Sequence, residues 1–158
     1  MSTTLIPSST STHTPLSGVR ARTIWATAGV SGAGFYRGFQ ARAEKIKNDF
    51  VSFLIEANRQ NKRVAAYGAA AKGNTLINFA GVRGDLISYV VDRNPFKQGN
   101  FLPGSRIPIV AEEHLKSDKP DVIVILPWNL ADELTGQLGY ARAWGAKFCT
   151  AIPEIKVW

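Results

Sequence analysis

A short apolar segment, a loop of glycine and alanine, and a helical pattern follow one another without interruption between residues 63 and 80. Arg63–Tyr67 has the pattern of a short buried strand, Gly68–Gly73 that of a tight loop, and Asn74–Ala80 that of a helix. The apolar side of this helix would consist of Leu76, Ile77 and Phe79. A strand that turns directly into a helix is typical of α/β domains, so this segment strongly limits the folds open to the chain.

The same alternation continues to the end of the chain. Four more apolar segments have the length of strands, namely Leu86–Val91, Ile107–Val110, Val122–Leu126 and Lys147–Ile152. Helical patterns at Ala111–Ser117 and Asn129–Trp144 separate the later strands. Because strands that alternate with helices usually pair in parallel, we expect a mostly parallel sheet of about five strands with helices on its faces.

The last of these helices has well-marked ends. Asn129 is suited to the N-cap, and Asp132 and Glu133 would favour the positive end of the helix dipole. Gly145 suits the position just after the C-terminus. The inner stripe of the helix would consist of Leu130, Leu134, Leu138 and Ala141.

A long amphipathic helix is predicted before the first strand, between Phe35 and Asn61. Its apolar positions recur at steps of three and four residues, and they are Phe39, Ala43, Ile46, Phe50, Phe53, Leu54 and Ala57. The chain before this helix is rich in serine and threonine and shows no periodicity. We therefore expect residues 1–34 to form a flexible tail and residues 35–158 to form the domain.

The loop after the first strand resembles a phosphate-binding motif. Gly68, Ala70 and Gly73 occupy the first, third and sixth positions of the pattern G-x-G-x-x-G, and Asp92 follows at the end of the next predicted strand. This context favours a Rossmann-like three-layer fold. The methyl group of Ala70 would push a pyrophosphate outward, whereas Lys72 adds a positive charge beside the helix N-terminus that would attract a phosphate.

Three polar loops follow predicted strands, and in an open parallel sheet such loops face one crevice where ligands bind. We therefore predict a site for an anionic small molecule, formed by Gly68, Ala69, Lys72, Gly73, Asn74, Thr75, Asp92, Arg93, Asn94, Lys97, Trp128 and Asn129. A simpler explanation stays open, in which both glycines only form a turn and Asp92 stabilises the bend before Asn94. Trp128 is equally well explained as an aromatic side chain that seals the sheet.

Composition narrows the classes of function. The net charge is +7, but residues 1–40 hold three arginines and no acid, and no basic stripe or exposed aromatic motif remains to suggest a nucleic-acid partner. One cysteine and two histidines cannot form a four-ligand zinc site, and Cys149 lies in an apolar run that favours the core over a nucleophile. A single cysteine and the absence of a long apolar run predict a cytoplasmic protein that no membrane anchors.

Several motifs occur in an order that resembles one family. They are Tyr67–Thr75, Tyr89–Pro95, Lys97–Gly99, Leu102–Gly104, Ile107–Ile109, Leu126–Leu130, Trp144–Gly145 and Ile152–Glu154. From about Tyr36 to Trp158 the chain is similar to the C-terminal domain of sugar C-methyltransferases. The resemblance implies a transferase that uses S-adenosylmethionine (SAM) to methylate a carbon of a deoxysugar attached to a nucleoside diphosphate.

The resemblance also implies a cysteine-rich zinc-binding domain and a methyl-donor domain, neither of which has a counterpart among these 158 residues. We therefore expect this chain to bind the nucleotide-sugar, to hold no cofactor and no catalytic residue of its own, and not to complete catalysis alone. In this interpretation the loop Gly68–Thr75 presents donors to the diphosphate and Lys72 neutralises it. Asp92 or Asn94 binds a hydroxyl group, and Trp128 with Asn129 lines the pocket.

Two other interpretations stay open. The segment Val90–Asp92 followed by Asn94 and Pro95 is also similar to coenzyme-A-binding Rossmann domains, so the chain would be an autonomous coenzyme A or dinucleotide binder. Alternatively the chain is a non-catalytic subunit that docks on a separate methyltransferase chain. The docking face would then be that of the first helix, with Phe39, Ile46, Phe50 and Phe53.

Overall fold

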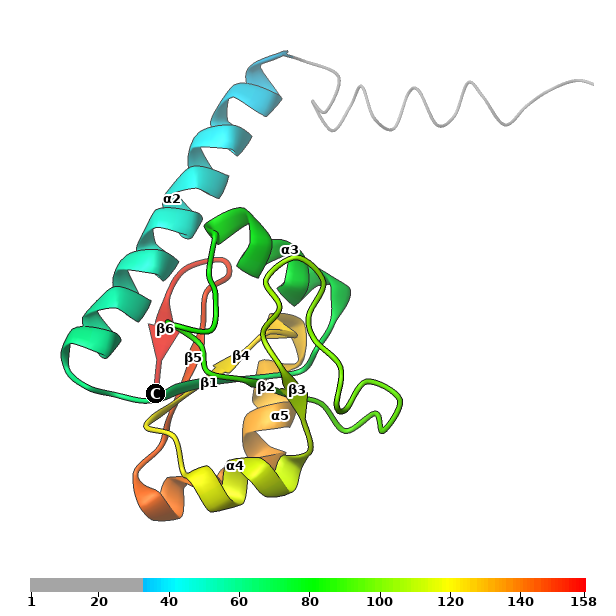
Figure 1. Ribbon diagram of the computed structural model, residues 1–158. Coiled ribbons are helices and arrows are strands. Elements are labelled where there is room, and N and C mark those ends of the chain that lie inside the picture. Colours follow the sequence, from blue (N-terminus) through cyan, green and yellow to red (C-terminus); the bar gives the residue numbers. More distant parts are fainter. Residues whose placement is uncertain (1–32) are drawn as a thin grey trace, which may run out of the picture. The chain divides into compact units, whose positions relative to one another are not determined.

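The computed structural model describes residues 33–158 (Figure 1). The predicted tail, residues 1–34, lies almost wholly outside the described residues, and its boundary stays a prediction. Two units can be distinguished, residues 1–40 and residues 41–158. The sheet and all of the predicted site residues belong to the second unit, to which the following description applies.

A six-stranded sheet forms the centre of this unit. Its strands are β1 (Val64–Tyr67), β2 (Val90–Val91), β3 (Ile109–Val110), β4 (Val122–Ile125), β5 (Lys147–Thr150) and β6 (Lys156–Val157). They lie in the order β3-β2-β1-β4-β5-β6, and every neighbouring pair is parallel except β5 with β6. The five predicted strands are confirmed. β6 was not predicted, because two exposed residues carry no apolar pattern.

All five predicted strands are shorter than predicted, and two of them begin two or more residues later. β2 begins at Val90 rather than at Leu86, and β3 begins at Ile109 rather than at Ile107. The backbone N–H groups of Leu86 and Ile87 both donate to the carbonyl of Arg83 in a turn. These two apolar residues therefore lie in a turn, and not in a β-strand, and pack into the core from there.

The helices cover both faces of the sheet. They are α2 (Ala33–Arg59), α3 (Ala71–Ala80), α4 (Glu112–Asp118) and α5 (Ala131–Gln137), with short 3₁₀ segments η1 (Trp128–Leu130) and η2 (Gly139–Trp144). The part of α2 from Ala41 onward and α3 lie on one face, and α4 and α5 on the other (Figure 1). The predicted Rossmann-like three-layer fold is thus confirmed. No helix within residues 33–158 is long and apolar enough to cross a membrane.

Alternation along β1 divides the core into two halves. Val64 and Ala66 pack with the helix residues Phe50, Leu54 and Ile77, whereas the intervening β1 residues pack against α4 and the segment that includes α5 and η2. This is the period-two pattern of a strand that is buried on both faces. Each half of the core depends on helices from only one side of the sheet.

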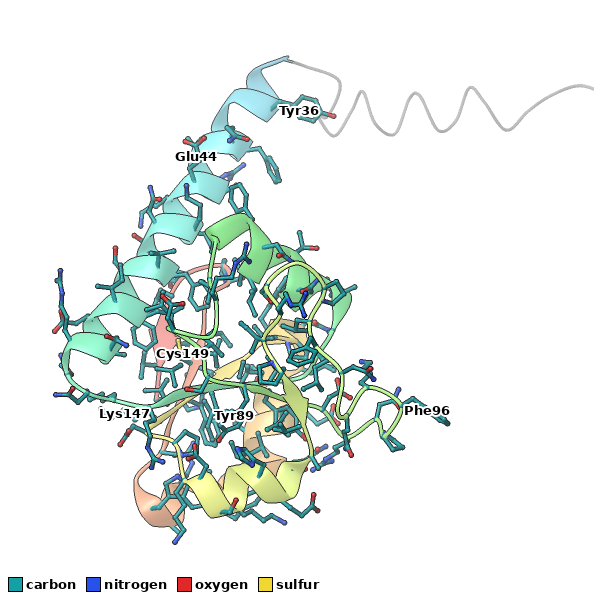
Figure 2. All side chains as sticks on the ribbon, in the orientation of Figure 1. Tyr36, Glu44, Tyr89, Phe96, Lys147 and Cys149 are labelled. Carbon is teal, nitrogen blue, oxygen red and sulfur yellow. The ribbon has the colours of Figure 1, made fainter. Side chains whose placement is uncertain are left out.

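Cys149 lies on β5, in the half of the core that contains α2, and is completely buried (Figure 2). Burial raises the pKa of its thiol to about 12, so the sulfur stays protonated near neutral pH. The prediction that Cys149 is a core residue is confirmed.

The first helix does not offer the docking face considered above. Phe50 is completely buried, and Ile46 and Phe53 pack against the same cluster from its edge. Phe39 belongs to the other unit, and its side chain is 58% exposed. Three of the four residues assigned to a docking face therefore belong to the interior, because the apolar stripe of this helix is used to cover the sheet.

The predicted helix Asn129–Trp144 consists of three pieces, η1, α5 and η2. Asn129 does not cap α5, because the chain first makes a 3₁₀ turn in which the N–H of Leu130 donates to the carbonyl of Pro127. Leu130 is consequently 44% exposed, contrary to the predicted stripe, whereas Leu138 is buried as predicted. Gly145 ends η2 with φ of 85°, which confirms its predicted role. Phe79 on α3 is also exposed, contrary to prediction.

Gly68 and Gly73 are required by the close approach of the chain that follows β4. A Cβ atom on Gly68 would lie 2.5 Å from Cγ of Pro127, and one on Gly73 would lie 2.5 Å from Cβ of Leu126. Gly68 also has a φ of 88°, which disfavours any side chain. The lack of a side chain on both glycines therefore allows the loop to pack directly against the end of β4.

The substitution Gly73→Ala should lower the free energy of unfolding by about 1–3 kcal/mol, because the new methyl group has no room beside Leu126. Gly136→Ala is the matched control. Gly136 lies within α5 with open space around it, so alanine there should stabilise the protein by about 0.5–1 kcal/mol. Urea unfolding of both variants measures the difference. Equal stability of the two variants would contradict the packing described for Gly73.

Candidate functional site

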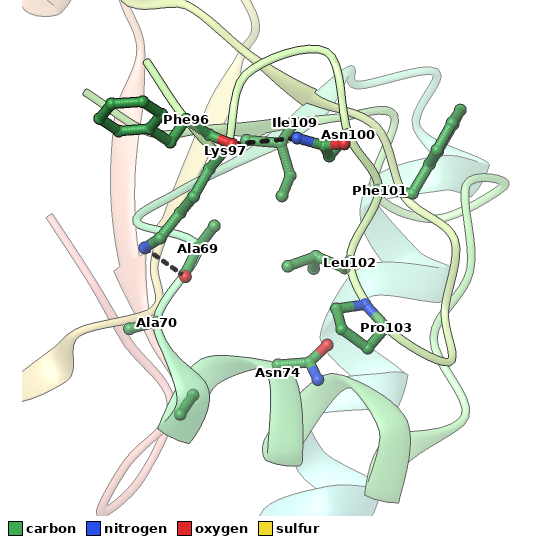
Figure 3. Close-up of a pocket in the computed structure, with 11 residues that line it drawn as sticks. Ala69, Ala70, Asn74, Phe96, Lys97, Asn100, Phe101, Leu102, Pro103 and Ile109 are labelled. Atoms are coloured by element: carbon green, nitrogen blue, oxygen red, sulfur yellow. Dashed lines mark hydrogen bonds between the residues drawn. The ribbon is translucent and has the colours of Figure 1, made fainter. Parts of the chain in front are cut away.

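The loops after β1 and β2 enclose a pocket of about 380 Å³ at the carboxyl edge of the sheet, called here the alanine pocket (Figure 3). One wall is the loop after β1 and the start of α3, with Ala69, Ala70, Ala71 and Asn74. The other is formed by residues 96, 97 and 100–103 together with Ile109. Most of the lining is apolar. Phe96 is 90% exposed and projects from the molecule, and Phe101 is also exposed (Figure 2). The pocket is therefore an open hollow with aromatic side chains at its rim.

Asp92 and Lys97 hold the two walls together. Oδ2 of Asp92 accepts hydrogen bonds from the N–H of Ala69 at 2.8 Å and from Nζ of Lys97 at 3.1 Å. Nζ of Lys97 also donates to the carbonyl of Ala69 at 2.9 Å, which is visible in Figure 3. Oδ1 of Asp92 accepts from the N–H of Asn94 at 2.8 Å. Both side chains that were predicted to meet a ligand are thus engaged in bracing the loops.

A second group of predicted residues gathers at the first turn of α3. Nζ of Lys72 donates to Oδ1 of Asn129 at 3.2 Å and lies 5.5 Å from the centre of the Trp128 ring. The N-cap residue Ala70 makes no side-chain hydrogen bond to this turn. The free N–H groups, the helix dipole and the ammonium of Lys72 together make this corner electropositive.

The Arg93 side chain bonds to neither group, although Arg93 lines a smaller hollow together with Gly68 and Asp92. Its Nε donates to Oε2 of Glu112 at 2.7 Å, and its Nη1 donates to Oε1 of Gln137 at 2.7 Å. The hydroxyls of Tyr67 and Tyr140 also donate to Glu112, at 3.2 Å and 2.8 Å. Glu112 is thus the centre of a polar network between β1, α4 and η2, and sequence reasoning missed it because a single carboxylate in a helix carries no spacing signal.

Charge and burial shift the pKa values of the ionisable groups in this network. Burial opposes ionisation of Glu112, but the hydrogen bonds from Arg93 and Tyr140 and the charge of Arg93 outweigh it and lower the pKa of this carboxyl. Burial, and after it the charge of Glu112, raises the pKa of Tyr67 to about 12. Burial likewise raises the pKa of Tyr140. The network therefore contains one anion, one cation and two neutral phenols at neutral pH.

The remaining predicted residues have mainly local contacts. Thr75 Oγ1 donates to the carbonyl of Ala71 within α3, and Asn74 Oδ1 accepts from the Asn78 side chain while Asn74 lines the alanine pocket. Oδ1 of Asn94 accepts from the N–H of Phe96, which closes the bend after β2. The simpler explanation of Asp92 as a turn residue describes its Oδ1, which accepts from the N–H of Asn94, but not its Oδ2, which accepts from Ala69 and Lys97.

A second hollow, called here the tryptophan groove, is lined in part by the two residues that contact Lys72, namely Trp128 and Asn129. It measures about 350 Å³, and its lining includes Trp128, Asn129, Asp132, Thr150, Glu154 and Trp158. Of these residues, the sequence predicted only Trp128 and Asn129 as site residues. The other four lie on α5, on β5, in the segment after β5 and directly after β6. Only the pairing of β6 with β5 shows that Trp158 belongs there.

The bracing role of Asp92 leads to the first prediction at this site. Asp92→Ala should lower the free energy of unfolding by about 1.5–3 kcal/mol, because the N–H of Ala69 and Nζ of Lys97 lose a charged acceptor. Asp85→Ala is the control, since Asp85 is exposed and its carboxylate has no hydrogen bond within the described residues, and a change below about 0.5 kcal/mol is expected. Urea unfolding provides the comparison. Unchanged stability of Asp92→Ala would leave its carboxylate free for a ligand.

The Glu112 network predicts a pH dependence. Because the folded state lowers the pKa of Glu112 below 4.5, its charged form stabilises the protein above that pH, and this contribution is lost as the pH falls through the folded-state pKa. The difference in free energy of unfolding between the wild type and Glu112→Gln should therefore be largest near neutral pH and become smaller below pH 4.5. Thermal unfolding of both proteins from pH 7 to pH 3 tests this. A difference that stays constant over the range would contradict it.

Comparison with known proteins identifies the family. Residues 8–153 match the C-methyltransferase C-terminal domain. C-methyltransferase NovU from Streptomyces niveus is 33% identical over 129 residues, which are 82% of this chain and 31% of NovU. The chain thus spans about a third of the length of this relative. The matched region includes β1 to β5 and all the loops that form the alanine pocket. The resemblance noted in the sequence is confirmed, and the chain belongs to the C-methyltransferase C-terminal domain family.

Proposed function

We propose that this chain binds a nucleoside-diphosphate sugar at the carboxyl edge of its sheet and presents the sugar to a SAM-binding methyltransferase part. That part would belong to a longer protein or to a separate chain. The observation that carries the proposal is the electropositive first turn of α3, which lies between two hollows of suitable size. No catalytic residue is assigned to this chain.

The diphosphate would lie at the start of α3. This helix is ten residues long, and its first turn has no side-chain cap, so the N–H groups of Ala71, Lys72 and Gly73 lack helical acceptors. An anion at this position is favoured by the helix dipole and by the exposed ammonium of Lys72. The methyl group of Ala70 keeps a phosphate from close contact with the loop backbone. The long side chain of Lys72 would therefore contribute more to binding it.

The nucleoside would occupy the alanine pocket. At about 380 Å³ the pocket falls within the range of small-ligand sites, and its lining is apolar with a few amide groups. Asn74 and Asn100 are the amide side chains in its wall, and Phe101 offers an exposed ring at its rim. A planar base suits this composition, since it presents apolar faces and polar edges.

S-adenosylmethionine does not suit the same loop. A dinucleotide-type site uses the acid after β2 to bind ribose, but the Asp92 carboxylate already accepts three hydrogen bonds from the protein. The space over Gly68 is filled by the ring of Pro127. We infer that the methyl donor is held outside these residues, and no step of methyl transfer is assigned to them.

Coenzyme A or a dinucleotide is the second candidate ligand. The strand order and the position of the glycine loop favour such a ligand, because its adenine would fit the alanine pocket as well as another base does. The engagement of Asp92 argues against a ribose anchored by that carboxylate. Direct comparison of ligands therefore has to decide between the two candidates.

A thermal-shift titration tests the proposal. The purified chain is titrated with dTDP-glucose, S-adenosylmethionine, NAD and coenzyme A. A ligand at 100 times its Kd adds about 2.7 kcal/mol, which for a domain of this size raises Tm by about 5–10 °C. We expect a shift with the nucleotide-sugar only. A shift with coenzyme A or NAD alone would replace the proposal by the second candidate, and a shift with S-adenosylmethionine would overturn the placement of the methyl donor.

The charge of Lys72 provides a sharper test. Lys72→Ala should weaken binding of dTDP-glucose by about 1.5–3 kcal/mol, because a charged hydrogen bond to the diphosphate is lost. The matched control is Lys147→Ala, since Lys147 is exposed at the start of β5, at the opposite edge of the sheet. Calorimetric titration measures both affinities. An equal effect of the two substitutions on the affinity would show that Lys72 takes no part in binding the ligand.

A further inference from the structure

We infer that the tryptophan groove is the subsite for the sugar ring, and that a bound ligand extends from the alanine pocket, past the first turn of α3, into this groove. The inference rests on the proposed function. It assigns a role to Trp158, Asp132 and Glu154, which no motif of the sequence connects.

The groove combines two aromatic rings with two carboxylates. Trp128 and Trp158 are both partly exposed in its lining. Asp132 and Glu154 are exposed, and neither carboxylate has an ion pair or a hydrogen bond within the described part of the chain. Asn129 adds an amide group. An indole ring offers a flat apolar surface, and carboxylates accept hydrogen bonds from hydroxyl groups.

These features suit an uncharged polyhydroxylated ring. A pyranose presents C–H groups on its faces and hydroxyl groups at its rim, so it matches indole surfaces flanked by acceptors. A phosphate group suits the groove poorly, because the two carboxylates outnumber its one lysine, Lys156. The alanine pocket differs in both respects, since its lining holds no carboxylate and no indole. The two hollows therefore favour different parts of one ligand.

Lys72 joins the two hollows. Its ammonium donates to Asn129 at 3.2 Å and lies 5.5 Å from the centre of the Trp128 ring, and both of these residues line the tryptophan groove. The neighbouring residue Ala71 lines the alanine pocket. A diphosphate at this turn would thus have the base on one side and the sugar on the other.

Trp158 is held in place by the sheet. Its backbone N–H and carbonyl both bond to Phe148 on β5, at 3.1 Å and 3.0 Å. Since Phe148 is completely buried, this pairing fixes the backbone of Trp158 at the edge of the core. The groove wall is therefore anchored to β5 and not carried by a free chain end.

The test compares dTDP with dTDP-glucose as calorimetric probes. The wild type should bind dTDP-glucose about tenfold more tightly than dTDP, the free-energy equivalent of roughly one or two hydrogen bonds to the sugar. The double variant Asp132→Asn/Glu154→Gln should lose this tenfold preference while its affinity for dTDP is unchanged. Both positions are exposed, so the variant is expected to fold, and Asp85→Asn is the matched control.

Trp158→Leu gives an independent measurement. It should reduce the affinity for dTDP-glucose but not for dTDP, and it should remove much of the change in tryptophan fluorescence that the sugar causes. Equal affinities of the wild type for the two probes, or an equal loss of both in the variants, would overturn the sugar subsite and leave nucleotide binding intact. Binding of neither probe would overturn the proposed function, and the subsite with it.

Discussion

The contact between the glycine loop and the chain leaving β4 determines the geometry of the whole carboxyl edge. Gly68 lies against Pro127 and Gly73 against Leu126, at separations that leave no room for a side chain on either glycine. This contact fixes where α3 begins, and with it the position of Lys72 relative to Trp128 and Asn129. Because β1 and β4 are neighbours at the point where the strand order reverses, the first turn of α3 is placed between the two hollows.

The acid after β2 illustrates how one motif can serve another purpose. In dinucleotide-binding domains an acid at this position meets ribose, but here the Asp92 carboxylate ties the N–H of Ala69 to the ammonium of Lys97. In the proposed function, ligand binding at this edge then depends on Lys72, on the first turn of α3 and on the walls of the two hollows. A structural role for Asp92 is consistent with a family in which this domain is one part of a longer enzyme, such as the relative of which this chain spans about a third.

Most of the secondary structure could be predicted from the sequence, because each element has a local cause. Five strands are short apolar runs, and the stripe of α2 that includes Phe50 and Leu54 follows helical periodicity and is buried. The errors have physical reasons. Leu86 and Ile87 form a turn because their amides bond to Arg83, and the last helix is interrupted because Gly136 and Gly139 weaken it and Pro127 starts a 3₁₀ turn.

The sequence by itself determined the α/β class, the family and the loops that gather at one edge of the sheet, since these depend on periodicity and on motifs within short segments. Only the tertiary structure decided the partner of each polar side chain. It bonded Arg93 to Glu112 and Asp92 to Lys97, and through the pairing of β6 with β5 it brought Trp158 into the same groove as Trp128. Such contacts join residues far apart in the chain, and their geometry is set by the packing of several elements at once, which no local pattern encodes.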